Sequence, residues 1–237
     1  MSQKLTTCFL QKNNKDYEQS INLRLANENI TRVNSTKFLG MIIDDKLNWQ
    51  DYINHTKNKM SSGLYALKKS KHVLGKNHLK TLYHSLIHPY LSYGLLLWGS
   101  ASKSLTKKIE VMQNKAVRSI TNSKYNESAL PLYKQLKILP LKHLYEQQLG
   151  KLMYMHSKHI LPLHIQSIFT PNNLIHTHGT RHANDPHFQH CTSSQIKSSF
   201  MHKAPAFWYQ LSPYIKDSTT IKTFNYRIKK QLFDILS

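Results

Sequence analysis

Basic side chains recur at helical spacing in the middle of this 237-residue chain. Lys108, Lys115 and Arg118 fall at positions i, i+7 and i+10, which places them on one flank of an α-helix with Lys107 beside them. Such a row can follow the phosphates of a nucleic acid, and the alternative is an ordinary solvated lysine face. With a second cluster on an earlier helix, the residues predicted to bind nucleic acid are Lys107, Lys108, Lys115, Arg118, Lys68, Lys69 and Lys71.

The composition favours a polyanionic partner. The chain has 33 Lys and Arg against 12 Asp and Glu, and a sequence pI near 9.9. Most of the excess lies in the middle of the chain rather than in a tail, which indicates a structured basic face. Cys8 and Cys191 are too few for a disulfide framework, and the N-terminus has no signal-peptide pattern. We therefore expect an intracellular chain without membrane contact.

Two adjacent carboxylates, Asp44 and Asp45, could bind metal ions for phosphoryl transfer, with Asp51 as a further ligand. The nearest acids upstream lie on predicted turns, so no third carboxylate is expected on a neighbouring strand. A helix is predicted to begin at about Asn48–Trp49, where carboxylates can accept hydrogen bonds from free N–H groups. We prefer this role at the helix start, and a metal-dependent enzyme using Asp44 and Asp45 remains the alternative.

A histidine-rich segment follows the predicted helical region and invites a zinc interpretation. Its spacings match no familiar ligand set and only one cysteine is present, so we assign no metal site and no catalytic residue. The residues concerned are His176, His178, His182, His187, His190 and Cys191.

The elements that must position these residues are mostly helical. From Lys76 onward apolar residues recur at helical spacing up to Leu91, with Pro89 predicted to kink or end the helix near His88. Further helical patterns run from Trp49 to about Leu74, and over 105–120, 130–139, 141–160 and the C-terminal tail. The side chains predicted to form the structural core are Leu82, Leu86, Tyr90, Trp98 and Trp208.

The predicted fold is mostly α. Three short strands, at 5–10, 21–26 and 33–43, make a small N-terminal antiparallel β element in residues 1–47. A helical bundle follows over 48–161, then a His-, Ser- and Asn-rich loop or linker over 162–200, and a helical tail over 201–237.

Four passages, in the same order along the chain, carry a resemblance to a known family. They are KFLGMIIDDKLNWQ from Lys37, KNHLKTLYHSLIHPYLSYGLLLWG from Lys76, KIEVMQNKAVRSIT from Lys108, and a tail reading TRHANDPHF and then SFMHKAPAFWYQLSPYIKDSTTIKTFNYRIKKQL. From about residue 20 onward the chain resembles the C-terminal part of reverse transcriptases from non-LTR (LINE-type) retrotransposons, namely the end of the palm, the thumb and the C-terminal region.

The resemblance implies a parent activity of RNA-directed DNA polymerisation with Mg²⁺ as cofactor, and RNA, RNA–DNA hybrid or DNA as partner. The catalytic carboxylates of the palm are not found in this chain, so we expect a fragment without polymerase activity or cofactor. Its residual role would be sequence-independent binding of RNA or RNA–DNA duplex. The further alternative is a truncated, non-functional retrotransposon-derived protein without stable activity.

Overall fold

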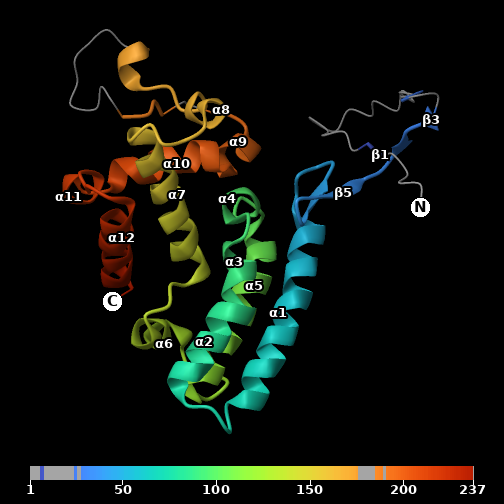
Figure 1. The fold of residues 1–237 in the computed structure, drawn as a ribbon, viewed down its shortest axis with the longest axis vertical. Helices are drawn as coiled ribbons and strands as arrows, with labels where there is room; N and C mark the ends of the chain where they lie inside the picture. Colours follow the sequence, from blue (N-terminus) through green and yellow to red (C-terminus); the bar gives the residue numbers. More distant parts are fainter. Residues whose placement is uncertain (1–5, 8–23, 26–27, 176–184, 189–190, 237) are drawn as a thin grey trace.

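The computed structural model describes residues 6–7, 24–25, 28–175, 185–188 and 191–236, and the chain is mostly helical, as predicted (Figure 1). The strands are β1 (Thr6–Thr7), β2 (Arg24–Leu25), β3 (Glu28–Asn29), β4 (Thr31–Arg32), β5 (Ser35–Phe38) and β6 (Met41–Asp44). The helices are α1 (Gln50–Ser70), α2 (Lys76–Leu86), α3 (His88–Ser92), α4 (Leu95–Trp98), α5 (Lys103–Thr121), α6 (Ala129–Leu136), α7 (Leu141–Ser157), α8 (Leu163–Gln166), η1 (Asn172–Leu174), α9 (Ser194–Ser198), α10 (Phe200–Gln210), α11 (Pro213–Lys216) and α12 (Ile221–Ile235).

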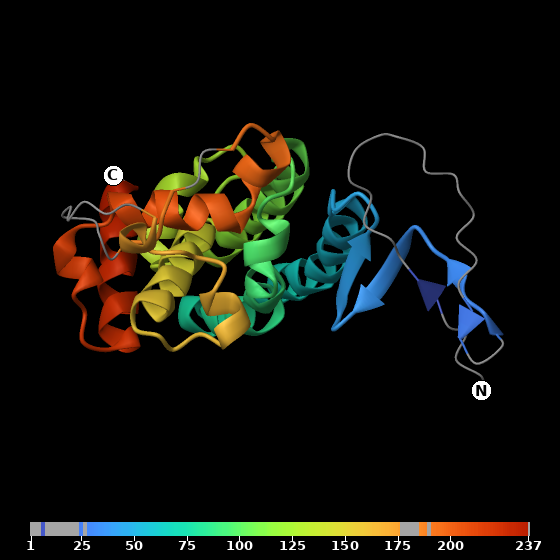
Figure 2. The ribbon, with the colours of Figure 1, turned by 90° about the horizontal axis from the view of Figure 1, so that it is seen from above.

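The described strands lie to one side of the helices and form pairs rather than one three-stranded sheet (Figure 2). The segment predicted as a single strand over 33–43 is a hairpin, with β5 antiparallel to β6. It turns at Leu39 and Gly40, whose φ values are 47° and 81°. Two consecutive residues with positive φ make the tight turn typical of two-residue hairpins, and Gly adopts this conformation without steric cost. The pair β1–β4 is parallel, which the sequence did not predict.

The first group of helices contains α1, α2, α5 and α6, with α1 and α5 packed side by side (Figure 1). One face of α1 is buried, from Tyr52 and Ile53 to Leu64 and Leu67. At Gly63 the backbone of α1 closely approaches the end of α2, since an added Cβ would lie 2.7 Å from the carbonyl oxygen of Leu86. A larger residue at this position would push the two helices apart.

The predicted break near His88 is present, and it changes which side chains are buried. The helix is interrupted at Ile87, with φ −121° and ψ −52°, and α3 begins with Pro89 in its first turn, where no N–H is required. The fully or nearly buried side chains are spaced four apart: Leu79, Tyr83, Ile87 and Leu91.

The prediction of a buried side chain is therefore wrong for two of the core residues. Leu86 is 36% exposed and Tyr90 is 38% exposed, while Leu82 is half-buried. The stripe that packs against α1 and α5 is narrower than the run of apolar residues, so its outer members face solvent. Burial is confirmed for Trp98, at 0% exposure, and for Trp208, at 3%.

A buried amide joins α5 to α2 and to the start of α7. Gln113 is 1% exposed; its Nε2 donates to the hydroxyl of Tyr83 and to the carbonyl oxygen of Leu139, both at 3.0 Å. Its Oε1 accepts from the backbone N–H of Leu141 at 2.9 Å. The contacts satisfy backbone groups that the turn before α7 would otherwise bury without partners.

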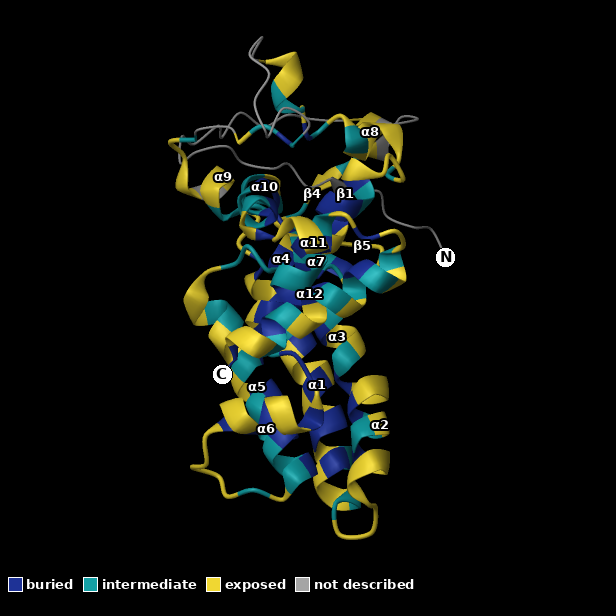
Figure 3. Ribbon diagram, turned by 90° about the vertical axis from the view of Figure 1, so that its left-hand side faces the viewer, coloured by how far each residue is buried: buried dark blue, intermediate teal, exposed yellow. Residues whose placement is uncertain are grey.

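The second group of helices consists of α7, α10 and α12, with α7 in contact with both of the others. Tyr154 stacks on Phe224 with ring centroids 4.6 Å apart, and Trp208 lies 6.2 Å from the same ring. Dark blue, buried residues line the inner faces of both groups (Figure 3). The helical tail predicted over 201–237 is built of α10, α11 and α12, and the described part of 162–200 contains α8, η1 and α9 besides its loops.

In the part of the chain that the structure describes, no helix combines the length and the apolar character needed to span a bilayer.

Candidate nucleic-acid interface

Helix α5 carries four of the predicted binding residues outside its buried side. That buried side includes Ile109, Met112 and Ala116. Lys107 and Lys108 are exposed, and Lys115 and Arg118 are half-buried.

The four side chains do not form one uniform row. The ammonium group of Lys107 pairs with Glu110 at 3.3 Å, and Nε of Arg118 donates to the carbonyl oxygen of Glu127 at 2.8 Å. The ammonium groups of Lys108 and Lys115 form no ion pair with the described residues, and their spacing of two helical turns keeps them on one flank.

The second predicted cluster lies at the C-terminal end of α1, where basic side chains meet the negative end of the helix dipole. Lys68 and Lys69 are exposed, and Nζ of Lys69 lies 5.7 Å from the ring centroid of Tyr65. Nζ of Lys71 donates to Oδ1 of Asn122, the residue that ends α5, at 3.2 Å. The structure thus brings the α1 cluster next to the C-terminal end of α5.

Contacts with α2 define which flanks of α1 and α5 lie on the same side. Gly63 of α1 faces α2, since it lies against the carbonyl oxygen of Leu86. Gln113 of α5 also faces α2, because it donates to the hydroxyl of Tyr83. Successive residues of an α-helix are rotated by about 100° around its axis. Lys68 therefore points roughly 140° away from the direction of Gly63 on α1. Lys108 and Lys115 point roughly 140–160° away from the direction of Gln113 on α5.

Because α1 and α5 pack against each other, these flanks form one face of the helix pair, opposite α2. Lys57 is exposed and lies on the same flank of α1 as Lys68, three helical turns earlier. We define the basic face as Lys57, Lys68, Lys108 and Lys115. Lys57 was not among the predicted binding residues, although its spacing from Lys68 could have indicated it.

The carboxylate of Asp44 is used at the start of α1. Its Oδ1 accepts from the N–H groups of Lys46 and Asn48 at 3.2 and 3.0 Å, and its Oδ2 accepts from Trp49 at 2.9 Å. Asp44 is 7% exposed, and Asp51 lies in the first turn of the helix. Both carboxylate oxygens are therefore bonded to backbone N–H groups of the segment that leads into α1, and none of these donors lies within the helix itself, which begins at Gln50.

The zinc interpretation concerns residues that lie mostly outside the described part of the chain, namely His176, His178, His182 and His190. Within the described part, Nδ1 of His187 contacts Oδ1 of Asn172 at 3.0 Å. No group of three or more His, Cys, Asp or Glu side chains placed to hold a metal ion occurs among the described residues.

The chain is similar to the RNA-directed DNA polymerases of non-LTR retrotransposons, as the four sequence passages predicted. Three proteins of Drosophila melanogaster show this. The probable RNA-directed DNA polymerase from transposon X-element is 27% identical over 112 residues, covering 46% of this chain and 12% of that protein. The corresponding protein from transposon BS is 26% identical over 118 residues (48% and 13%), and the RNA-directed DNA polymerase from mobile element jockey is 32% identical over 108 residues (43% and 12%).

The match therefore covers 12–13% of the length of these relatives. No protein-family model and no solved structure matches the chain.

Proposed function

We propose that this chain is a region of a retrotransposon reverse transcriptase that binds RNA or an RNA–DNA duplex without sequence preference, through the basic face of α1 and α5. The observation that carries the proposal is the placement of Lys57, Lys68, Lys108 and Lys115 on one side of two packed helices. The similarity to RNA-directed DNA polymerases supports a nucleic acid as the polyanion.

The two helices suit phosphate binding because their other sides are fixed by the core. Ile53, Leu64 and Ile109 are buried between the helices of the first group, so α1 and α5 are held in place without any ligand. Lysines on such helices contact phosphates without a large ordering cost to the backbone, and phosphate contacts carry no sequence information. We propose that residues 48–161 correspond to the thumb of the parent enzyme.

Replacing all four lysines of the basic face by Gln tests this function. Affinity for an RNA–DNA hybrid, measured by fluorescence anisotropy, should fall about tenfold or more, because exposed ion pairs contribute about 0.2–1 kcal/mol each. A control removes the same charge from exposed lysines outside the basic face: Lys124, Lys151, Lys222 and Lys230. Equal losses in the two variants would show that only net charge matters and would contradict the proposal.

We further propose that the chain alone does not extend a primer. Support comes from Asp44, whose carboxylate is buried and occupied by three backbone N–H groups instead of pointing at a metal site. Primer extension on an RNA template with Mg²⁺ tests this, with Asp44→Asn and Asp45→Asn as variants. Extension that disappears in either variant, while the melting curve is kept, would establish the metal-dependent alternative.

A further inference from the structure

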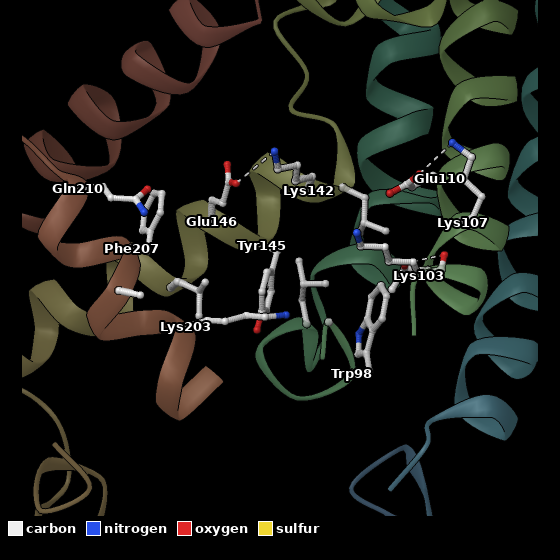
Figure 4. A pocket seen from close by; sticks show the side chains of 16 residues that line it. Trp98, Lys103, Lys107, Glu110, Lys142, Tyr145, Glu146, Lys203, Phe207 and Gln210 are labelled. Atoms are coloured by element: carbon white, nitrogen blue, oxygen red, sulfur yellow. Dashed lines mark hydrogen bonds and ion pairs between the residues drawn. The ribbon is translucent and has the colours of Figure 1, made fainter. Parts of the chain in front are cut away.

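A cleft of about 610 Å³ lies between α4–α5 on one side and α7–α10 on the other (Figure 4). Four lysines line it: Lys103 and Lys107 from α5, Lys142 from α7 and Lys203 from α10. They come from three separate regions of the sequence, and the fold places them around the same cleft. None of the four belongs to the basic face.

Only half of this positive charge is balanced within the cleft. Lys107 pairs with Glu110 at 3.3 Å, and Lys142 pairs with Glu146 at 3.9 Å. Lys103 and Lys203 form no ion pair with any residue that the structure describes. Burial lowers the pKa of Lys203, and its Nζ lies over the ring of Tyr145, whose centroid is 5.4 Å away. An anion in the cleft would supply the missing charge.

The cleft also holds a buried hydroxyl without a partner. Tyr145 is 9% exposed, and its hydroxyl makes no hydrogen bond with the described part of the chain. Burial raises the pKa of Tyr145 to about 12, so the phenol is a neutral donor at neutral pH. A buried donor without an acceptor is unfavourable, and a ligand oxygen would supply the missing acceptor.

Aromatic rings run along the cleft from Phe207 on α10 across Tyr145 on α7 to Trp98 on α4 (Figure 4). Trp98 is fully buried and forms part of the wall, whereas Phe207 is partly buried and lines the cleft. Flat rings beside ammonium groups are the two features that single-stranded nucleic-acid sites combine.

We propose that this cleft binds one unpaired nucleotide of a single-stranded nucleic acid. Lys103 and Lys203 hold its phosphate, the ring of Phe207 stacks on its base, and the hydroxyl of Tyr145 donates to a base or sugar oxygen. The volume lies within the range of about 300–1,000 Å³ that is usual for small-ligand sites. The proposal extends the proposed function from duplex phosphates to an unpaired nucleotide and uses a different set of residues.

The probe is a short single-stranded oligonucleotide carrying aminopurine, whose fluorescence is quenched when the base stacks. The wild-type chain should quench it. Phe207→Leu, which keeps an apolar side chain but removes the flat ring, should weaken binding roughly 5–150-fold. Tyr145→Phe, which removes only the hydroxyl, should weaken it by about five- to tenfold. The double variant Lys103→Gln/Lys203→Gln should lower the slope of log K against log salt by about 1.4.

Lys151→Gln, an exposed lysine on α7 outside the cleft, is the matched control and should leave quenching unchanged. A blunt RNA–DNA hybrid separates the two functions. The cleft variants should leave its affinity within about twofold, whereas the four-lysine variant of the basic face should weaken hybrid binding and retain quenching. Quenching that survives Phe207→Leu and Tyr145→Phe would overturn the proposal. The proposal would also be overturned if an acidic peptide displaced the oligonucleotide at equal concentration and bound the same variants more weakly.

Discussion

Replacing Gln113 by Leu should destabilise the helical bundle more than any exposed substitution. Leucine fills most of the volume of the glutamine side chain but lacks the amide nitrogen and oxygen that make the hydrogen bonds. It leaves the carbonyl oxygen of Leu139, the N–H of Leu141 and the hydroxyl of Tyr83 without the bonds that they make at 2.9–3.0 Å. Each such buried group costs about 1–3 kcal/mol, so the three together cost roughly 3–9 kcal/mol. A domain with a total stability of about 5–15 kcal/mol would be close to unfolding.

Urea unfolding followed by far-UV circular dichroism measures this loss. Gln135→Leu on α6, at an exposed position, is the control and should change the free energy of unfolding by about 0.5 kcal/mol or less. Tyr83→Phe in the Gln113→Leu background should restore part of the stability, because it removes one of the three stranded groups. Equal stability of Gln113→Leu and Gln135→Leu would refute the account of Gln113 as the polar centre of the bundle.

Three further predictions concern packing and pH. Ile87→Ala should cost about 2–5 kcal/mol and Leu86→Ala clearly less, since their exposures are 0% and 36%; equal losses in urea unfolding would contradict this burial pattern. Gly63→Val should cost about 1–3 kcal/mol or more because its Cβ would meet the Leu86 carbonyl oxygen at 2.7 Å, and an unchanged unfolding midpoint would speak against the close approach. Burial, together with nearby positive charges, lowers the pKa of His84 and His88 below 6.5, so the unfolded chain binds more protons and stability should decline as the pH falls below 6.5. The double variant His84→Gln/His88→Gln should flatten that decline in melting curves, and an unaltered pH profile would count against it.

The local apolar periodicity predicted the helices well, because the residues that form each amphipathic stripe lie close together in the sequence. The buried stripe of α2 is narrower than its apolar periodicity predicts, since periodicity does not say how much of a helix face its neighbours cover. Leu86 and Tyr90 are apolar at helical spacing and still lie outside the contact with α1 and α5. The apolar run over 33–43 predicts a single strand, whereas Gly40 allows the positive φ of the turn at Leu39–Gly40 that divides it into a hairpin.

The candidate sites depend on contacts between distant residues. The basic row on α5 was visible in its spacing, but the spacing alone could not show that Lys107 and Arg118 would be occupied by Glu110 and Glu127. The cleft was not predicted because Lys103 on α5 and Lys203 on α10 line the same cleft only in the folded chain. The periodicity of a sequence indicates local secondary structure and does not indicate which distant residues line the same cleft.

The most direct test of phosphate binding by the basic face is the dependence of affinity on salt. Anisotropy titrations of the wild-type chain and the four-lysine variant, on two RNA–DNA hybrids of unrelated sequence, give log K against log salt. If each lysine neutralises one phosphate, the variant should reduce the slope by about 2.8–3.6, with the same reduction on both hybrids. An unchanged slope in a variant with a normal melting curve would mean that Lys57, Lys68, Lys108 and Lys115 form only a solvated face.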